Sequence, residues 1–174
     1  MKIVIAGGGQ VGEKLCEVLT RENHDVVVID TDIERLDQLG TIYDILCVHG
    51  NGAVFSVLKE AEVPQCSLFI AVSPHDEVNI LAAMTAKRIG ADYCIARVRN
   101  PEYMEQVYFM RDELGIDLII NPEMKSARKI FNVVVPKCMS RLRSRRTLTA
   151  AKSDTAPRLM YRRKTTMIQS VNSG

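Results

Sequence analysis

Tryptophan is absent from this sequence of 174 residues, and other aromatic residues are few. No apolar run approaches the roughly 18 residues that a membrane-spanning helix needs. The hydrophobic start at Ile3 is interrupted by Gly7 to Gln10, before it could form the core of a signal peptide. We therefore expect a cytoplasmic protein.

Recognisable cysteine and histidine patterns are also missing. The five cysteines include no C-x-x-C pair and lie mostly in apolar runs, which predicts small buried side chains in a reducing compartment. The three histidines (His24, His49 and His75) form no cluster with metal-ligand spacing. The sequence thus predicts neither a disulfide framework nor a metal site.

Acidic residues are scarce at one end of the chain only. Residues 1–130 carry 13 Lys and Arg against 20 Asp and Glu, whereas residues 131–174 carry 10 against 1. Beyond Pro136 neither helical nor alternating periodicity persists. We expect an acidic folded domain over 1–135 and a basic, poorly ordered tail over 136–174.

What the sequence does contain is a glycine motif between two predicted strands. An apolar run from Ile3 to Ala6 leads into Gly7, Gly9 and Gly12 at the spacing G-x-G-x-x-G. A helical pattern follows, and then a second apolar run that ends at Asp30, 18 residues after Gly12. This order is typical of a β-turn-α-β unit that binds an adenine nucleotide.

Apolar runs and helical patterns alternate along the rest of the acidic domain. Further strands are expected at 45–49, 68–72, 94–98 and 117–120, with helices between them and another helix over 123–135. We expect the second helix to end at Gly40, and a single helix to precede Gly115. Right-handed crossovers then imply an α/β fold of Rossmann type, a doubly wound six-stranded parallel sheet in the order 3-2-1-4-5-6.

Each residue of the glycine motif has an expected task. Gly7 permits the tight turn and Gly9 lets the backbone approach a pyrophosphate. The helix that begins near Gln10 directs free N–H groups toward the same anion, and Gly12 allows this helix to pack closely. Asp30 would accept hydrogen bonds from the ribose hydroxyls and repel a 2′-phosphate, which favours NAD(H) over NADP(H). The same carboxylate would also hold the ribose of ATP.

Other candidates lie at the ends of later strands. Gly50, Asn51 and Gly52 either border an adenine or form a turn without a ligand. Ser73 and Asp76 either approach the ligand or only cap a helix. Arg97 and Arg99 project to one side of a strand end, where they would meet phosphates or form ordinary salt bridges.

Two familiar catalytic patterns are absent. The glycine motif continues with Gly12-Glu13, without the Lys and Ser/Thr of a Walker A loop. No tyrosine is followed four positions later by lysine. Only about 40 residues follow the sixth predicted strand and the helix expected over 123–135, fewer than a substrate domain requires. We interpret the domain as a nucleotide sensor rather than an enzyme.

Six segments in order carry a family resemblance: KIVIAGGGQVG, Asp30, GNG at 50–52, AVSPHDEVNILAAMTAK, IARVRNPEY and LGIDLIINPE. Together they resemble the N-terminal regulatory domain of bacterial and archaeal Trk-type potassium uptake proteins (TrkA family), called RCK or KTN. The likeness runs from Met1 to about Ile130. It implies a cytoplasmic regulatory subunit, peripheral on the inner face of the membrane, which binds NAD(H) or ATP/ADP and gates a potassium-translocating subunit.

The resemblance also implies roles for individual residues. Arg99 and Glu123 would lie near the contact between subunits of a homo-oligomer, a dimer or a larger ring. The positions that would hold the nucleotide fall into four groups: Gly7, Gly9, Gln10, Val11 and Gly12 for the phosphates, Asp30 for the ribose, Asn51 and Gly52 for the adenine side, and Ser73 with Arg97 for the more distal groups.

Family members usually continue with a crossover helix and a further domain, which the basic tail replaces here. The tail is either the product of a truncated or frame-shifted reading, the interpretation we favour, or a genuine cationic segment. Two other functions remain open. One is a small NAD-dependent dehydrogenase, and the other is a protein whose basic tail binds a membrane surface or nucleic acid. We expect nucleic acid not to be the partner.

Overall fold

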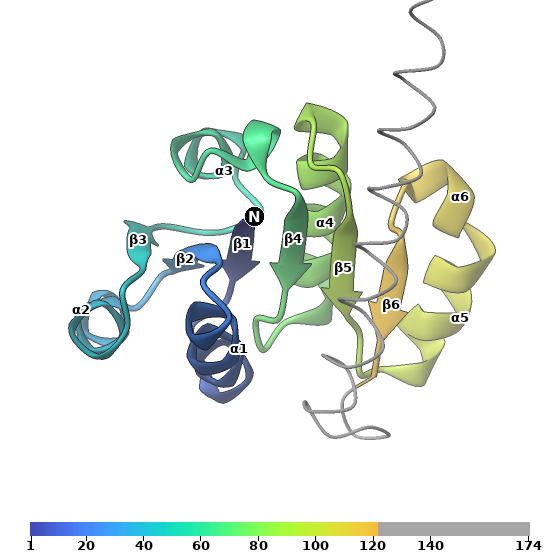
Figure 1. Cartoon of the computed structure of the whole chain (residues 1–174). Coiled ribbons are helices and arrows are strands. Elements are labelled where there is room, and N and C mark those ends of the chain that lie inside the picture. The colour runs from blue at the N-terminus through green and yellow to red at the C-terminus, as the bar shows by residue number, and fades with distance from the viewer. Residues whose placement is uncertain (122–174) are drawn as a thin grey trace, which may run out of the picture.

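Six parallel strands form one sheet at the centre of the protein (Figure 1). The computed structural model describes residues 1–121. The strand order is β3-β2-β1-β4-β5-β6, which confirms the predicted doubly wound topology. The strands are β1 (Lys2–Ala6), β2 (Asp25–Asp30), β3 (Leu46–His49), β4 (Leu68–Ala71), β5 (Cys94–Arg97) and β6 (Leu118–Ile120).

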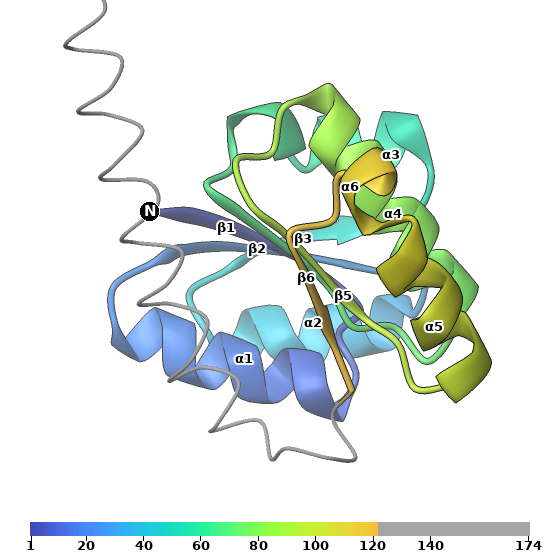
Figure 2. The same cartoon turned by 90° about the vertical axis from the view of Figure 1, so that its right-hand side faces the viewer.

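Helices cover both faces of the sheet, as Figure 2 shows. Two of them, α1 (Gln10–Arg21) and α2 (Ile33–Ile42), lie on one face. The other face carries α3 (Phe55–Glu60), α4 (Asp76–Ile89), α5 (Pro101–Phe109) and α6 (Arg111–Leu114), with a short 3-10 helix at Val63–Gln65. The two layers of core correspond to the alternation of side chains along each strand. Ile3 and Ile5 face α1, whereas Val4 and Ala6 belong to the layer beneath α4.

Two helices differ from the sequence prediction. Helix α2 continues through Gly40 to Ile42, because Gly40 keeps a helical backbone and does not take the positive φ of a C-terminal glycine cap. The single helix expected before Gly115 is broken at Met110 into α5 and α6. Apolar periodicity lapses at this break, where Phe109 is 91% exposed.

The buried face of α4 carries small and polar side chains. Its buried residues are Asp76, Asn79, Ala82, Ala83 and Ala86, whereas Leu81 is exposed. The helix therefore buries small side chains, one carboxylate and one amide, an arrangement that hydrophobic periodicity does not detect.

The cysteines divide into two kinds. Cys16, Cys66 and Cys94 are buried as predicted, and burial raises the pKa of the Cys16 and Cys66 thiols to about 12. These thiols are therefore protonated and unreactive near neutral pH. Cys47 is exposed, because β3 is an edge strand with one open side.

Several expectations fall outside the described residues. They are the helix over 123–135, Glu123, Cys138, the boundary at 135 and the basic tail. Among residues 1–121, no helix is both long enough and apolar enough to cross a membrane.

Candidate functional site

The turn after β1 is shaped by glycine. Gly7 has φ +112°, its N–H donates to the carbonyl oxygen of Ile29 at 2.8 Å, and a Cβ there would lie 2.7 Å from the backbone nitrogen of Ser73. A side chain at Gly7 would thus be excluded both by the backbone conformation and by the adjoining strand.

The other two glycines of the motif, Gly9 and Gly12, have opposite surroundings, one open and one tightly packed. A Cβ on Gly9 would meet nothing within 4 Å, so this position is open for a ligand. A Cβ on Gly12 would lie 1.9 Å from the carbonyl oxygen of Gly7, because helix α1 packs directly against the turn. Gly12 therefore supports the turn from behind.

Helix α1 directs its N-terminus into a cavity. Gly9 is the N-cap and provides no side-chain hydrogen bond, while Gln10 and Val11 of the first turn line the cavity. First-turn N–H groups without a capping side chain, together with the helix dipole, favour an anion at this position. The cradle thus fits a phosphate group.

Asp30 ends β2 beside the glycine turn, with its side chain only 9% exposed. Its Oδ2 accepts the Gly8 N–H at 2.6 Å, and its Oδ1 accepts the Asp32 N–H at 2.9 Å. The carboxylate therefore ties the glycine turn to the end of β2. Two carboxylate oxygens offer about four acceptor sites, so Asp30 retains capacity for further donors.

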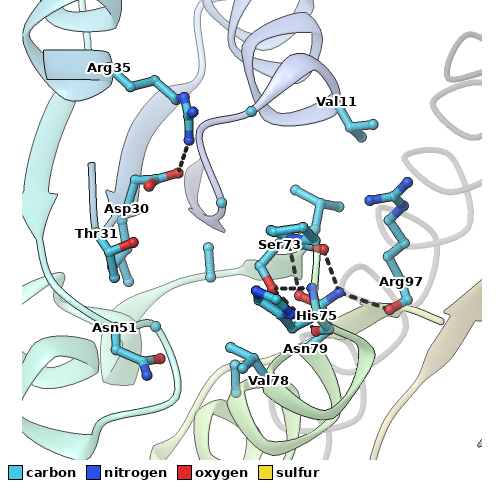
Figure 3. A pocket seen from close by; sticks show the side chains of 18 of the residues that line it. Val11, Asp30, Thr31, Arg35, Asn51, Ser73, His75, Val78, Asn79 and Arg97 are labelled. Carbon is cyan, nitrogen blue, oxygen red and sulfur yellow. Dashed lines mark hydrogen bonds and ion pairs between the residues drawn. The ribbon is translucent and has the colours of Figure 1, made fainter. Parts of the chain in front are cut away.

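Arg35 is a residue of this site that our sequence interpretation missed. It lies one turn into α2, its guanidinium is 3.5 Å from Asp30 Oδ2 and 3.2 Å from Asp32 Oδ2, and it lines the cavity (Figure 3). Thr31, not an arginine, directly follows Asp30, and Arg35 lies five positions after Asp30. The missed signal is helical spacing, since Asp32 and Arg35 stand at i and i+3.

The turn after β3 closes the same end of the cavity. The Gly50 N–H donates to the Asp30 carbonyl oxygen at 2.8 Å, and a Cβ on Gly52 would lie 2.7 Å from Ala6 Cβ. Asn51 Oδ1 accepts the Ala53 N–H at 2.9 Å, which is an Asx-type turn. The Asn51 side chain thus has a local structural role, and the residue also lines the cavity.

The opposite end of the cavity is formed after β4 and β5. Ser73, Asn79 and Arg97 all line it, and Asn79, which is almost completely buried, connects the backbones of the other two. Asn79 Oδ1 accepts the Ser73 N–H at 2.8 Å, while its Nδ2 donates to the carbonyl oxygens of Ser73 at 3.0 Å and Arg97 at 2.9 Å (Figure 3). The sequence interpretation missed Asn79 because a single polar residue between Val78 and Ile80 gives no motif.

Asp76 has a role that neither expected alternative described. It does not line the cavity, and the N-cap of α4 is His75. Its Oδ2 accepts the N–H groups of Arg99 and Asn100, each at 2.8 Å. Asp76 therefore fastens the loop between β5 and α5 to the first turn of α4.

The two arginines at the end of β5 are separated. Arg97 lines the cavity, whereas Arg99 is joined to Asp76 at 3.7 Å and to the carbonyl oxygen of Pro74. The Ser73 hydroxyl, for its part, donates to the His75 carbonyl oxygen at 3.2 Å. Of this group, Ser73 and Arg97 thus face the cavity and Arg99 belongs to the supporting loop.

The cavity measures about 430 Å³ and lies across the carboxyl ends of β1, β2 and β4. Pockets of roughly 300–1,000 Å³ are typical of small-molecule sites. Gly12 alone of the ten predicted nucleotide-binding residues does not line it, and the nine that do are Gly7, Gly9, Gln10, Val11, Asp30, Asn51, Gly52, Ser73 and Arg97.

The sheet order and the position of this cavity define a Rossmann-type domain, a class in which ligands bind where the strand order reverses. The chain belongs to the TrkA-N domain family, whose family model matches residues 3–122.

Two curated relatives support this membership. A Trk system potassium uptake protein TrkA homolog from Archaeoglobus fulgidus is 38% identical over 134 residues, which are 77% of this chain and 30% of the relative. The Trk system potassium uptake protein TrkA of Halomonas elongata is 42% identical over 125 residues, 71% of this chain and 27% of the relative. The chain therefore spans less than a third of the length of these relatives.

Solved structures show the same fold. The TrkA-N domain of the inner membrane protein ybaL from Escherichia coli matches with a TM-score of 0.63 and 24% identity, over 76% of this chain and 96% of that one. The GsuK channel bound to NAD matches with a TM-score of 0.59 and 21% identity, over 68% of this chain and 21% of the channel. GsuK has also been solved bound to ADP.

Proposed function

We propose that the chain is a nucleotide-sensing regulatory domain of a potassium uptake system and that it binds NAD(H), with ATP or ADP as the alternative ligand. One observation carries the proposal: the uncapped N-terminus of α1 and the carboxylate of Asp30 face one cavity in a TrkA-N domain. An anion site and a carboxylate beside it match the phosphate and the ribose of one nucleotide.

Different residues of the cavity would bind different parts of the nucleotide. Gly7, Gly9, Gln10 and Val11 would hold the phosphates, and Asp30 would hold the ribose. Asn51 and Gly52 would border the adenine, while Ser73 and Arg97 would meet the distal groups. Gly12 would act through the turn that it supports, because it lies behind the cavity wall. The nucleotide is here a ligand to be sensed, and no reaction is assigned to it.

Regulation requires a partner. We place the domain on the cytoplasmic side of the membrane, in a homo-oligomer attached to a potassium-translocating subunit. The names of the curated relatives, Trk system potassium uptake proteins, support the link to potassium uptake. A nucleotide changes the activity of such an assembly only if it binds two of its arrangements with different affinities.

Titration calorimetry of the whole chain tests the proposal. NADH, NAD, ATP and ADP are titrated separately, and NADH is then incubated with the protein and common 2-oxo acids. We expect saturable binding of at least one nucleotide and no consumption of NADH. Steady oxidation of NADH would identify an enzyme. If none of the four nucleotides bound, the proposed role as a nucleotide sensor would be refuted.

A further inference from the structure

Two polar side chains are buried among the described residues, and both lie in the first turns of α4. Asp76 is 7% exposed and Asn79 is 1% exposed, whereas the other buried positions of this helix are alanines. Residues at i and i+3 share one face of a helix, so both side chains are directed at the strand ends beneath α4. Burial of polar groups is costly unless they are hydrogen-bonded, which makes their partners informative.

The hydrogen bonds of the Asp76 carboxylate and of the Asn79 amide all go to backbone atoms, which belong to residues 73, 97, 99 and 100. The pairing of β4 with β5 ends at Ala71 opposite Ala96. Asn79 bridges the two chain segments just beyond this pairing, since it bonds to Ser73 on one side and to the Arg97 carbonyl on the other. Asp76 continues this bridge to the N–H groups of Arg99 and Asn100.

We infer that Asn79 is a positioning residue that makes the site select adenosine ligands longer than a mononucleotide. By holding the backbones of Ser73 and Arg97 at a fixed separation, it shapes the end of the cavity that lies beyond the first phosphate. This inference rests on the proposed function, because it concerns the same nucleotide. An asparagine suits the task because its side chain both accepts and donates, as the Ser73 N–H and the two carbonyl groups require.

The adenosine end of the cavity is built independently of Asn79. Gly8 and Asp32 bond to Asp30, and Gly50 bonds to the backbone of the same residue. None of these bonds involves α4. Loss of Asn79 should therefore change the affinity for a ligand that reaches Ser73 and Arg97, and leave the affinity for AMP unchanged.

The test compares AMP with NADH by titration calorimetry on the full chain and on Asn79→Ala. The wild-type protein should bind NADH more tightly than AMP. In Asn79→Ala the affinity for NADH should fall about ten-fold, a change of about 1.4 kcal/mol, while the affinity for AMP stays within about two-fold. A matched control is Leu58→Ala, which removes a fully buried side chain from α3 outside the cavity. It should lower stability and keep the ratio of the two affinities.

Two results would overturn the inference. One is an unchanged ratio of the NADH and AMP affinities in Asn79→Ala, whether both stay the same or both fall by one factor, and the other is equal affinities of the wild-type protein for AMP and NADH. Failure of the wild-type chain to bind any nucleotide would instead refute the proposed function, and this inference with it.

A second measurement uses only the wild-type protein, so its result does not depend on whether a variant folds. Amide hydrogen exchange of the wild-type protein should show that NADH, but not AMP, slows exchange at Arg99 and Asn100, the loop that α4 fastens. Equal protection of these amides by the two ligands at saturation would contradict the inference.

Discussion

The two ends of the cavity are built on different principles. At the end where we propose that adenosine binds, a charged side chain, the Asp30 carboxylate, lies at the cavity surface and binds the glycine turn beside it. At the distal end a neutral and almost completely buried side chain, Asn79, binds the backbones of the residues that face the cavity. A ligand would thus meet the Asp30 carboxylate at one end. At the other end it would meet Ser73 and Arg97, whose backbones are held by Asn79.

This difference affects what a substitution reports. Removal of Asp30 deletes a carboxylate that would contact the ligand, whereas removal of Asn79 acts mainly by displacing Ser73 and Arg97, whose backbones it holds. The glycine turn lies between the two ends and touches both, since Gly7 adjoins Ser73 while Gly8 adjoins Asp30. Substitutions at the turn should therefore have the largest effects.

Gly12→Ala should damage both ends at once. The added Cβ would lie 1.9 Å from the Gly7 carbonyl oxygen, so α1 or the turn must shift. We expect the free energy of unfolding to fall by roughly 1–3 kcal/mol or more, and affinity for AMP and NADH to fall together. Urea denaturation and calorimetry measure the two effects.

Gly9→Ala is the matched control for this variant. Its Cβ meets no protein atom within 4 Å, and Gly9 has φ −67°, which alanine adopts readily. Stability should stay near that of the wild-type protein, while nucleotide affinity falls because the methyl group occupies the open side of the turn. Wild-type stability in Gly12→Ala would contradict the packing assigned to that glycine.

Asp30→Ala should weaken only the adenosine end. Hydrogen bonds to a charged group contribute about 1.5–3 kcal/mol, so affinity for AMP and for NADH should fall by a similar factor, on the order of 10–100. The preference for NADH over NADPH should also diminish, because the carboxylate that repels a 2′-phosphate is gone. Calorimetric titration with the three ligands measures these changes.

Asp32→Ala serves as the control for Asp30. Asp32 caps α2 by accepting the Arg35 N–H at 3.1 Å and does not line the cavity. Its loss should cost about 0.5–2 kcal/mol of stability with little change in affinity. If Asp30→Ala bound AMP as tightly as the wild-type protein, the ribose assignment would be wrong.

Arg35→Ala should give the smallest effect. The guanidinium is 43% exposed, and exposed ion pairs contribute about 0–1 kcal/mol. The free energy of unfolding should change by less than about 1 kcal/mol, and affinity should change less than in Asp30→Ala. A loss of AMP binding as large as that of Asp30→Ala would show that the charge at this end belongs to an Asp–Arg pair acting as one group.

The same contrast explains what could be predicted from the sequence. The strands were predictable because runs such as Val26 to Ile29 are buried on both faces, and Asp30 was found because its distance from Gly12 is characteristic of a nucleotide-binding unit. Asp30 lines the same cavity as Gly7 and Gly9, whereas Gly12 packs behind the turn.

The distal end was harder to predict because its chemistry depends on backbone groups. Asn79 carries no motif, and its partners lie up to 18 residues away in the chain. Helix α4 packs on the sheet through small alanines and leaves the larger side chain of Leu81 exposed. Periodicity alone does not distinguish these two ways of packing a helix.

Competition between AMP and NADH tests most directly the claim that the two ends form one nucleotide site. NADH binding to the full chain is followed by calorimetry at a series of fixed AMP concentrations. The account predicts that the apparent dissociation constant of NADH rises linearly with the concentration of free AMP and reaches no plateau, with the stoichiometry unchanged. Simultaneous binding of both ligands, with an unchanged NADH affinity at saturating AMP, would contradict it.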